Sequence, residues 1–437
     1  MYKNLFSSIR TLSTRSFSFV PLLGSLSLLL PQVASSYELT NEVTTQWRGF
    51  AHEGDADQQR SDFALEYQAE FFYEADSGSD FLIVEPKLRV DQHDPERNLI
   101  DLNKAYWNHL GEGWELRAGI HKVFWGVTES RHLVDVINQT DAASSLDQED
   151  KLGQPMINTS IEFESGILDL FLLAGHRERN FPGEDGRFRT FIPIDNDAAQ
   201  YESSKEEKRI DWAARWVQTL DDTDVGVYLF SGTSREPVLV FNNNLLDPKL
   251  EPYYPVITQL GLDVQHVYES WLFKLEAIYR SGFDYSADSG VESDHHYKAV
   301  VAGFEYTQVG IFDSAMDLGW IGEYLYDSRG EDDPVATFED DWFVGWRLAF
   351  NDVDDTELLA GLILDPSSSE NTLGLEYSQR LSDSLALAVE GRTWFGGDKA
   401  PDSLQEALME LQTGDSRDKM ASFMNDDYVE VNLTYYF

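Results

Sequence analysis

Apolar and polar side chains alternate along almost the whole sequence with a period of two residues. Between positions 62 and 75, for example, apolar residues occupy one parity while Asp62, Glu66 and Glu70 occupy the other. The apolar residues of this stretch are Phe63, Leu65, Tyr67, Ala69, Phe71 and Tyr73. Because successive side chains of a strand point to opposite faces, whereas a helix repeats every 3.6 residues, the pattern predicts β-strands.

About eighteen segments show this alternation, separated by short turns and long loops in turn, as in bacterial barrels. Sixteen would fit nearly as well, because the weaker early segments can be divided differently. The predicted strands span 39–50, 62–75, 81–91, 99–109, 114–121, 156–164, 166–174, 209–219, 224–232, 257–267, 271–281, 297–307, 315–326, 342–350, 357–364, 371–380, 384–395 and 427–437. The segment 403–412 has a helical pattern, with Leu404, Ala407, Leu408 and Leu411 on one face.

The number of strands indicates which parity faces inward. A soluble closed barrel of about eighteen strands would enclose a space too wide for side chains to fill. We therefore expect a transmembrane antiparallel up-and-down β-barrel of about 16–18 strands, with one short loop helix, a polar lumen and an apolar outer face. Aromatic residues near the strand ends fit the two girdles of such a barrel, although they could instead pack a soluble core. They are Trp47, Tyr73, Trp107, Trp114, Trp271, Tyr279, Trp320, Tyr326, Trp342, Trp394, Tyr435 and Phe437.

The last predicted strand, 427–437, ends on an aromatic ring. Its apolar parity holds Val429, Val431, Leu433, Tyr435 and Phe437. We expect it to pair with 384–395 and to close the barrel against 39–50. The ending resembles the C-terminal signal of Gram-negative outer-membrane β-barrels of the porin-like type. The resemblance implies a location in the cell outer membrane, contact with its lipid and lipopolysaccharide, and recognition of this strand by barrel-assembly machinery.

The first residues have the order of an export signal. Lys3, Arg10 and Arg15 precede an uncharged stretch rich in Leu and Phe, which small residues follow. This order predicts a secretory signal peptide over 1–36, removed on export. The stretch is too short and too polar for a membrane-spanning helix. No break in composition divides 37–437, which we interpret as a single transmembrane β-barrel domain.

Charge and composition exclude several classes of function. The chain carries 78 acidic and 33 basic residues, a formal charge of -45, so nucleic acid is not an expected partner. Aromatic residues reach 13%, which argues for a folded chain despite this charge. The absence of cysteine excludes disulfides, thiolate catalysis and Cys-ligated metals.

No catalytic motif stands out. The sequence contains no GxSxG, HExxH, P-loop or GxGxxG pattern, so we expect no catalytic residues, no cofactor and no enzyme activity. The histidines are scattered, and we expect no metal site. The acidic run 147–150 has the oxygen ligands that calcium takes, but not the EF-hand spacing, and solvated loop charge is the simpler interpretation.

Charged residues on the inward parity are candidates for lining a pore. Facing acidic and basic rows would create a transverse field and restrict the bore. The alternative is that they form structural ion pairs that stiffen the wall. The basic candidates on this parity are Lys87, Arg89, Arg215, Arg280, Arg347 and Arg392.

The stretch 122–155 shows neither sustained alternation nor a helical stripe, and it is the candidate constriction. The residues before it resemble a segment of some porin-like families, where a strand ends in G-[KR]-Q-x-x-x-W-G and the next loop folds inward. Gly119, Trp125 and Gly126 match this pattern, whereas the basic-Gln pair is replaced and Lys122 comes one place later. The resemblance implies a loop that enters the bore.

On that basis the first candidates for pore lining are Arg117, Lys122, Arg131 and Asp135. The expected function is an outer-membrane porin-like channel for passive diffusion of small hydrophilic solutes or ions. The alternatives are an outer-membrane enzyme of the lipase or esterase kind, or a non-conducting structural barrel.

Overall fold

The computed structural model of the protein describes residues 36–54, 58–286, 290–330, 333, 336, 338–397, 400–401, 403–413 and 419–437. Side chains at 36, 283–295 and 410–413 are not described. The described residues belong to one unit, Ser36–Phe437. All of the predicted signal peptide except its last residue lies outside the described part of the chain.

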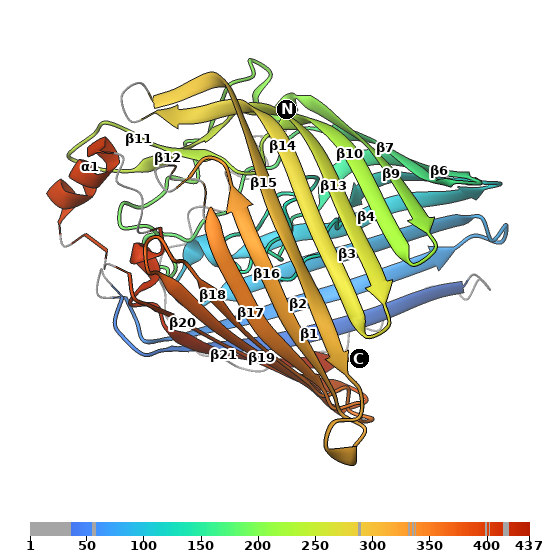
Figure 1. The fold of residues 1–437 in the computed structure, drawn as a ribbon. Coiled ribbons are helices and arrows are strands. Elements are labelled where there is room, and N and C mark those ends of the chain that lie inside the picture. The colour runs from blue at the N-terminus through green and yellow to red at the C-terminus, as the bar shows by residue number, and fades with distance from the viewer. Residues whose placement is uncertain are drawn as a thin grey trace, which may run out of the picture. The chain divides into compact units, whose positions relative to one another are not determined.

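Within that part, an 18-stranded sheet accounts for most of the residues (Figure 1). Its strands are β1 (Ser36–Phe50), β2 (Ser61–Glu74), β3 (Asp80–Asp91), β4 (Leu99–Gly111), β5 (Trp114–His121), β6 (Gln154–Phe163), β7 (Gly166–Ala174), β9 (Ile210–Leu220), β10 (Thr223–Thr233), β13 (Val256–Tyr268), β14 (Trp271–Ser286), β15 (Gly290–Gln308), β16 (Asp317–Asp327), β17 (Asp340–Ala349), β18 (Glu357–Leu364), β19 (Asn371–Ser382), β20 (Leu385–Phe395) and β21 (Tyr428–Tyr436). Each pairs antiparallel with the next along the chain. The predicted up-and-down antiparallel barrel is confirmed, at the upper of the two predicted strand numbers.

The last strand closes the ring against the first. β21 pairs with β1 from Glu42↔Tyr436 to Phe50↔Tyr428, and with β20 on its other edge. The end of the chain is part of this seam, because the backbone N–H of Phe437 donates to the carbonyl oxygen of Asn41 at 3.0 Å. Both predicted neighbours of the closing strand are thus confirmed. Within the described residues, closure leaves the 18-stranded sheet without a free strand edge.

The two faces of the wall have the polarity of a membrane barrel. Phe437 is 60% exposed and Tyr279 of β14 is 52% exposed, whereas Glu276 on the opposite face of β14 is fully buried. Soluble proteins show the reverse, since they keep carboxylates at the surface and large apolar groups inside. The sequence predicts Trp394 in an outer aromatic girdle. This prediction is wrong, because Trp394 is buried inside the barrel, where its ring packs against that of Phe423. It has the parity of Arg392, which also points inward.

Long loops gather at one end of the barrel and carry the remaining elements. The other strands are β8 (Gln200–Tyr201), β11 (Val238–Phe241) and β12 (Leu250–Tyr254), and the short helical elements are η1 (Pro95–Arg97), η2 (Glu206–Lys208), η3 (Ile311–Asp313), η4 (Ala421–Phe423) and α1 (Leu404–Thr413). β8, β11 and β12 form a separate small sheet, which the sequence did not indicate. α1 confirms the predicted helix. Its buried Ala407 packs with Ile192 and Leu250, so the helix covers part of the loop cluster.

Candidate pore and its constriction

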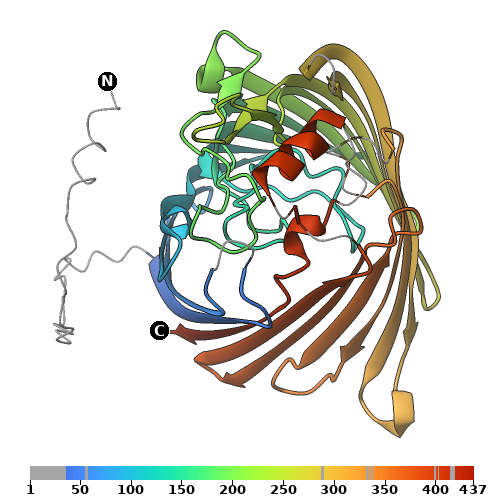
Figure 2. The same cartoon turned by 90° about the vertical axis from the view of Figure 1, so that its left-hand side faces the viewer.

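The segment between β5 and β6, residues 122–153, lies inside the ring of strands, and we call it the crossing loop (Figure 2). Trp125 anchors its first part, with its ring 5.5 Å from that of Phe171 on β7 and 4.9 Å from that of Tyr228 on β10. Gly126 has a φ of 154°, and a Cβ there would lie 2.6 Å from Nδ1 of His132. The Trp-Gly pair noted in the sequence therefore has a physical role, since it lets the chain turn tightly against the wall.

The carboxylate of Glu276 on β14 accepts hydrogen bonds from the middle of the crossing loop. Its Oε1 accepts hydrogen bonds from the backbone N–H of Val127 at 2.7 Å and from the N–H and hydroxyl of Thr128 at 3.1 and 2.7 Å. Its Oε2 accepts the N–H of Val134 at 3.2 Å. A buried carboxylate is thus satisfied by donors from the loop. Because β6, β7, β9, β10 and β13 separate β5 from β14 around the ring, the loop crosses the interior.

Glu323 of β16 holds the next part of the loop. It accepts the backbone N–H of Glu129 at 2.7 Å, the N–H of Ser130 at 2.8 Å and the Ser130 hydroxyl at 2.5 Å. The Glu129 carboxylate in turn accepts from Arg347 of β17 at 2.6 Å. The crossing loop is therefore attached to three strands of the far wall.

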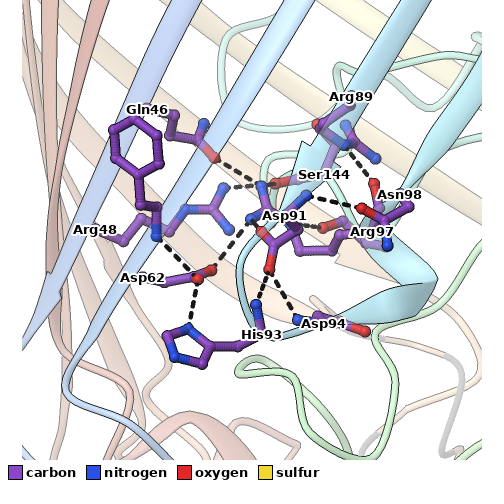
Figure 3. A network of polar contacts seen from close by, with 12 residues as sticks. Gln46, Arg48, Asp62, Arg89, Asp91, His93, Asp94, Arg97, Asn98 and Ser144 are labelled. Carbon is purple, nitrogen blue, oxygen red and sulfur yellow. Dashed lines mark hydrogen bonds and ion pairs between the residues drawn. The ribbon is translucent and has the colours of Figure 1, made fainter. Parts of the chain in front are cut away.

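The returning part of the crossing loop is attached to the opposite wall by buried arginines (Figure 3). Arg89 of β3 pairs with Asp141 at 2.7 Å, and Arg48 of β1 donates to the carbonyl oxygen of Ser144 at 2.5 Å. Arg97 donates to the carbonyl oxygen of Ala143 at 2.8 Å. Burial, followed by repulsion from Arg48, lowers the pKa of Arg97 to about 10, which leaves it charged at neutral pH.

A cavity of about 510 Å³ remains beside the crossing loop. The loop forms one side of it, and the inner faces of β14 to β20 form much of the other. Two glycines, Gly361 and Gly374, are part of this wall. A Cβ built on Gly374 would lie 4.0 Å from its nearest neighbour, so the space in front of this strand is open.

One carboxylate in the cavity wall is surrounded by guanidinium groups. Glu236, which follows β10, pairs with Arg280 at 2.6 Å and with Arg131 at 3.2 Å. Burial acts to raise its pKa, but the charges of Arg280, Arg131 and Arg329 outweigh burial and hold the pKa of Glu236 well below its usual range. The group is therefore ionised at neutral pH and fixes two arginines at the edge of the cavity.

The ten candidate residues from the sequence divide into two groups. Four line the cavity: Arg131, Asp135, Arg280 and Arg392. Six are not among its lining residues: Lys87, Arg89, Arg117, Lys122, Arg215 and Arg347. Eight of the cations pair with carboxylates, namely Lys87 with Glu66, Arg89 with Asp141, Arg117 with Glu115, Arg131 and Arg280 with Glu236, Arg215 with Asp263, Arg347 with Glu129 and Arg392 with Glu390.

Sequence reasoning missed the residues that hold the crossing loop. Glu323 had a usable signal, because its nearest neighbours on the inward parity of β16 are Ile321 and Leu325, and a buried acid flanked by apolar residues requires a partner. Glu276 shares the inward parity of the candidate Arg280 on β14, but parity alone does not identify it as the acceptor for a loop. Glu236 and Arg329 lie in irregular loops, where no period indicates their direction.

Among the residues that the structure describes, no group of three or more His, Asp or Glu side chains is arranged to hold a metal ion. In the same residues, no helix has the length and apolar character needed to cross a membrane.

No family model matches the sequence, and no curated protein matches it. Solved structures of Pseudomonas aeruginosa Occ porins are similar in fold. OccK3 (OpdO) is 9% identical, with 92% of this chain and 95% of that one covered and a TM-score of 0.52. OccK11 (OpdR) is 12% identical, with 92% and 96% covered and a TM-score of 0.50, and OccD3 (OpdP) is 9% identical, with 92% and 91% covered and a TM-score of 0.50. The chain therefore has the porin fold, a closed antiparallel barrel of 18 strands.

Proposed function

We propose that this protein is an outer-membrane channel through which small hydrophilic solutes or ions diffuse passively, after removal of a signal peptide over 1–36. The observation that carries the proposal is the cavity of about 510 Å³ between the crossing loop and the wall of β14 to β20. Its lining is rich in charged side chains, as a path for hydrated solutes requires. The loop that narrows the bore is held by Glu276 and Glu323, so the opening has a defined size.

The proposed activity is transport without chemistry. Glu276 and Glu323, the buried carboxylates nearest to a loop hydroxyl, are already engaged by backbone N–H groups, which leaves them poorly placed as general bases. A plugged, non-conducting barrel is the competing proposal, because loops fill much of the interior. Single-channel recording of purified protein in a planar bilayer separates the two. Discrete conductance steps support a channel, and their absence at all salt concentrations and voltages supports the plug.

Arg392 should influence ion selectivity because it lines the cavity from β20. Arg392→Gln leaves Glu390 and Glu376 without their neighbouring guanidinium, and we expect the ratio of cation to anion permeability to rise roughly twofold. Reversal potentials in a salt gradient measure this ratio. Arg117→Gln is the matched control, since Arg117 pairs with Glu115 and is not among the lining residues. Equal shifts in both variants would contradict the assignment of the cavity as the ion path.

Deletion of Phe437 should reduce the amount of assembled barrel more than the conductance of each assembled molecule. The residue contributes its N–H and carbonyl to the seam with Asn41 and exposes its ring outward, where we propose that barrel-assembly machinery recognises it. The yield of folded protein in outer-membrane fractions measures assembly. Phe437→Tyr retains the ring and the backbone and is expected to assemble normally. If the deletion variant and the wild type give equal yields of folded protein, Phe437 is not part of the proposed assembly signal.

A further inference from the structure

Two turns at the short-turn end of the barrel, 309–316 and 350–356, carry large apolar side chains that are highly exposed. Figure 1 shows the first of these turns at the lower end of β15 and β16. In the turn between β15 and β16, Val309 is 76% exposed and Phe312 is 89% exposed. In the turn between β17 and β18, Val353 is 92% exposed. The other short turns, 75–79, 112–113, 164–165, 221–222, 269–270 and 383–384, contain no large apolar residue. Large apolar residues at the strand ends beside other turns, such as Tyr268 and Leu220, are 59% and 52% exposed, whereas within the turns themselves large apolar side chains occur in these two.

The two turns are fixed to one another. The side-chain amide of Asn351 donates to the carbonyl oxygen of Ala315 at 2.8 Å and to the Asp317 carboxylate at 2.9 Å. The other oxygen of Asp317 accepts the backbone N–H of Gly310 at 2.8 Å, which closes the first turn. The apolar side chains are therefore presented on a defined platform.

Phe312 is held in an unfavourable backbone conformation. Its φ of 56° and ψ of 30° lie in the left-handed region, which bulky residues rarely adopt. A glycine or asparagine at this position would relieve the strain with little loss of packing, because Phe312 is 89% exposed. Strain kept at an exposed site points to a role for the ring.

The two turns lie beyond the lipid-facing part of the wall. Three aromatic residues, Trp271, Tyr306 and Trp320, mark the edge of that part. The ring centroids of Trp271 and Tyr306 are 4.6 Å apart, and the indole N–H of Trp320 donates to the side-chain oxygen of Gln308 at 3.0 Å. Val309 and Phe312 follow Gln308 and are accompanied by charged aspartates. These carboxylates exclude the turns from the hydrocarbon.

Carboxylates surround the exposed side chains. They belong to Asp313, Asp317, Asp352, Asp354 and Asp355. Neither 309–317 nor 350–356 contains a lysine or arginine. Among the described residues, Arg380 pairs with one of these five carboxylates, 3.6 Å from Asp355, and Arg347 pairs with Glu357 just after the second turn. The electrostatic potential at these turns is therefore negative and favours a positively charged partner.

We propose that Val309, Phe312 and Val353, with these five aspartates, form a docking surface, the double-turn surface, for a protein segment in which Lys or Arg flanks a large apolar side chain. The apolar groups would bury against the three exposed side chains while the cations meet the carboxylate rim. The partner approaches from the short-turn side, which faces the periplasm in the proposed orientation. The inference does not depend on whether the lumen conducts.

Binding of a synthetic peptide of alternating leucine and lysine to the barrel in nanodiscs tests the proposal, with fluorescence anisotropy as the readout. Phe312→Ser with Val353→Ser should weaken binding at least about tenfold, and Asp313→Asn with Asp354→Asn should do the same. Asp221→Asn with Asp222→Asn is the control, because it removes two carboxylates from a turn without exposed apolar residues, and it should change binding less than about twofold. Equal weakening by the control, or none by the first two variants, overturns the proposal.

Phe312→Gly separates a binding role from a structural one. This variant should unfold at the same temperature as wild type or higher, because glycine accepts the left-handed conformation, and yet lose peptide binding. A lower unfolding temperature would show that the Phe312 ring stabilises the folded barrel, which contradicts the proposed binding role. Two further results would also overturn the proposal: quenching of Phe312→Trp fluorescence by brominated lipid chains, which assigns the surface to the membrane, and self-association abolished by Phe312→Ser, which assigns it to a second copy.

Discussion

Glu276→Ala should release the crossing loop from β14 and raise the single-channel conductance. The substitution leaves the N–H groups of Val127, Thr128 and Val134 without their acceptor. Each unsatisfied buried donor costs about 1–3 kcal/mol, so the loop loses much of its attachment to this wall. Because the Glu323 attachment remains, we expect a partly mobile loop, a conductance at least about twofold higher and larger current fluctuations.

Two further variants make the result specific. Glu276→Gln retains one carbonyl oxygen in the position that accepts three of the four hydrogen bonds, so it should stay close to wild type. Glu70→Ala removes another carboxylate of the inner wall, but its partner Lys104 keeps a bond to Glu85 at 2.7 Å. Its conductance should not change. Wild-type conductance and noise in a correctly assembled Glu276→Ala barrel would show that this contact does not hold the loop.

The barrel strands could be predicted because the information is local. A period of two residues is visible within one segment, and the predicted 114–121, 166–174 and 357–364 agree with β5, β7 and β18 to the residue. β8, β11 and β12 are two to five residues long and are defined by contacts between distant loops. Such segments are too short to show a period. Their pairing depends on where the long loops meet, which the local sequence does not encode.

For the candidate site, the sequence predicts only which face of the wall each side chain lies on. Parity correctly placed Arg280 and Arg392 on the inner face, but which of the inward cations border open space depends on where the crossing loop lies. That path is set by long-range hydrogen bonds, such as those from Val127 to Glu276. Arg117, a first candidate from its position next to the loop, pairs with Glu115 on its own strand and is not among the residues that line this cavity.

Gly374→Trp should block the proposed path without disturbing the barrel. Gly374 is on the inward face of β19, where it pairs with Arg392 and lines the cavity. Because a Cβ there meets nothing closer than 4.0 Å, the strand can accept a side chain that projects into the lumen. An indole occupies a large share of a cavity of about 510 Å³, and we expect the single-channel conductance to fall at least about fivefold.

The same substitution on the opposite face provides the control. Gly391 of β20 has outward parity, and the nearest atoms to a Cβ there are 3.7 and 3.9 Å away, so Gly391→Trp adds an indole to the lipid-facing side. Both variants place tryptophan on adjacent strands at neighbouring positions of the register, and both should assemble normally. They differ in whether the added ring faces the cavity or lipid. A fall in conductance for Gly374→Trp alone locates solute passage at the cavity beside β19, whereas equal conductance in the two variants would require a path elsewhere in the barrel.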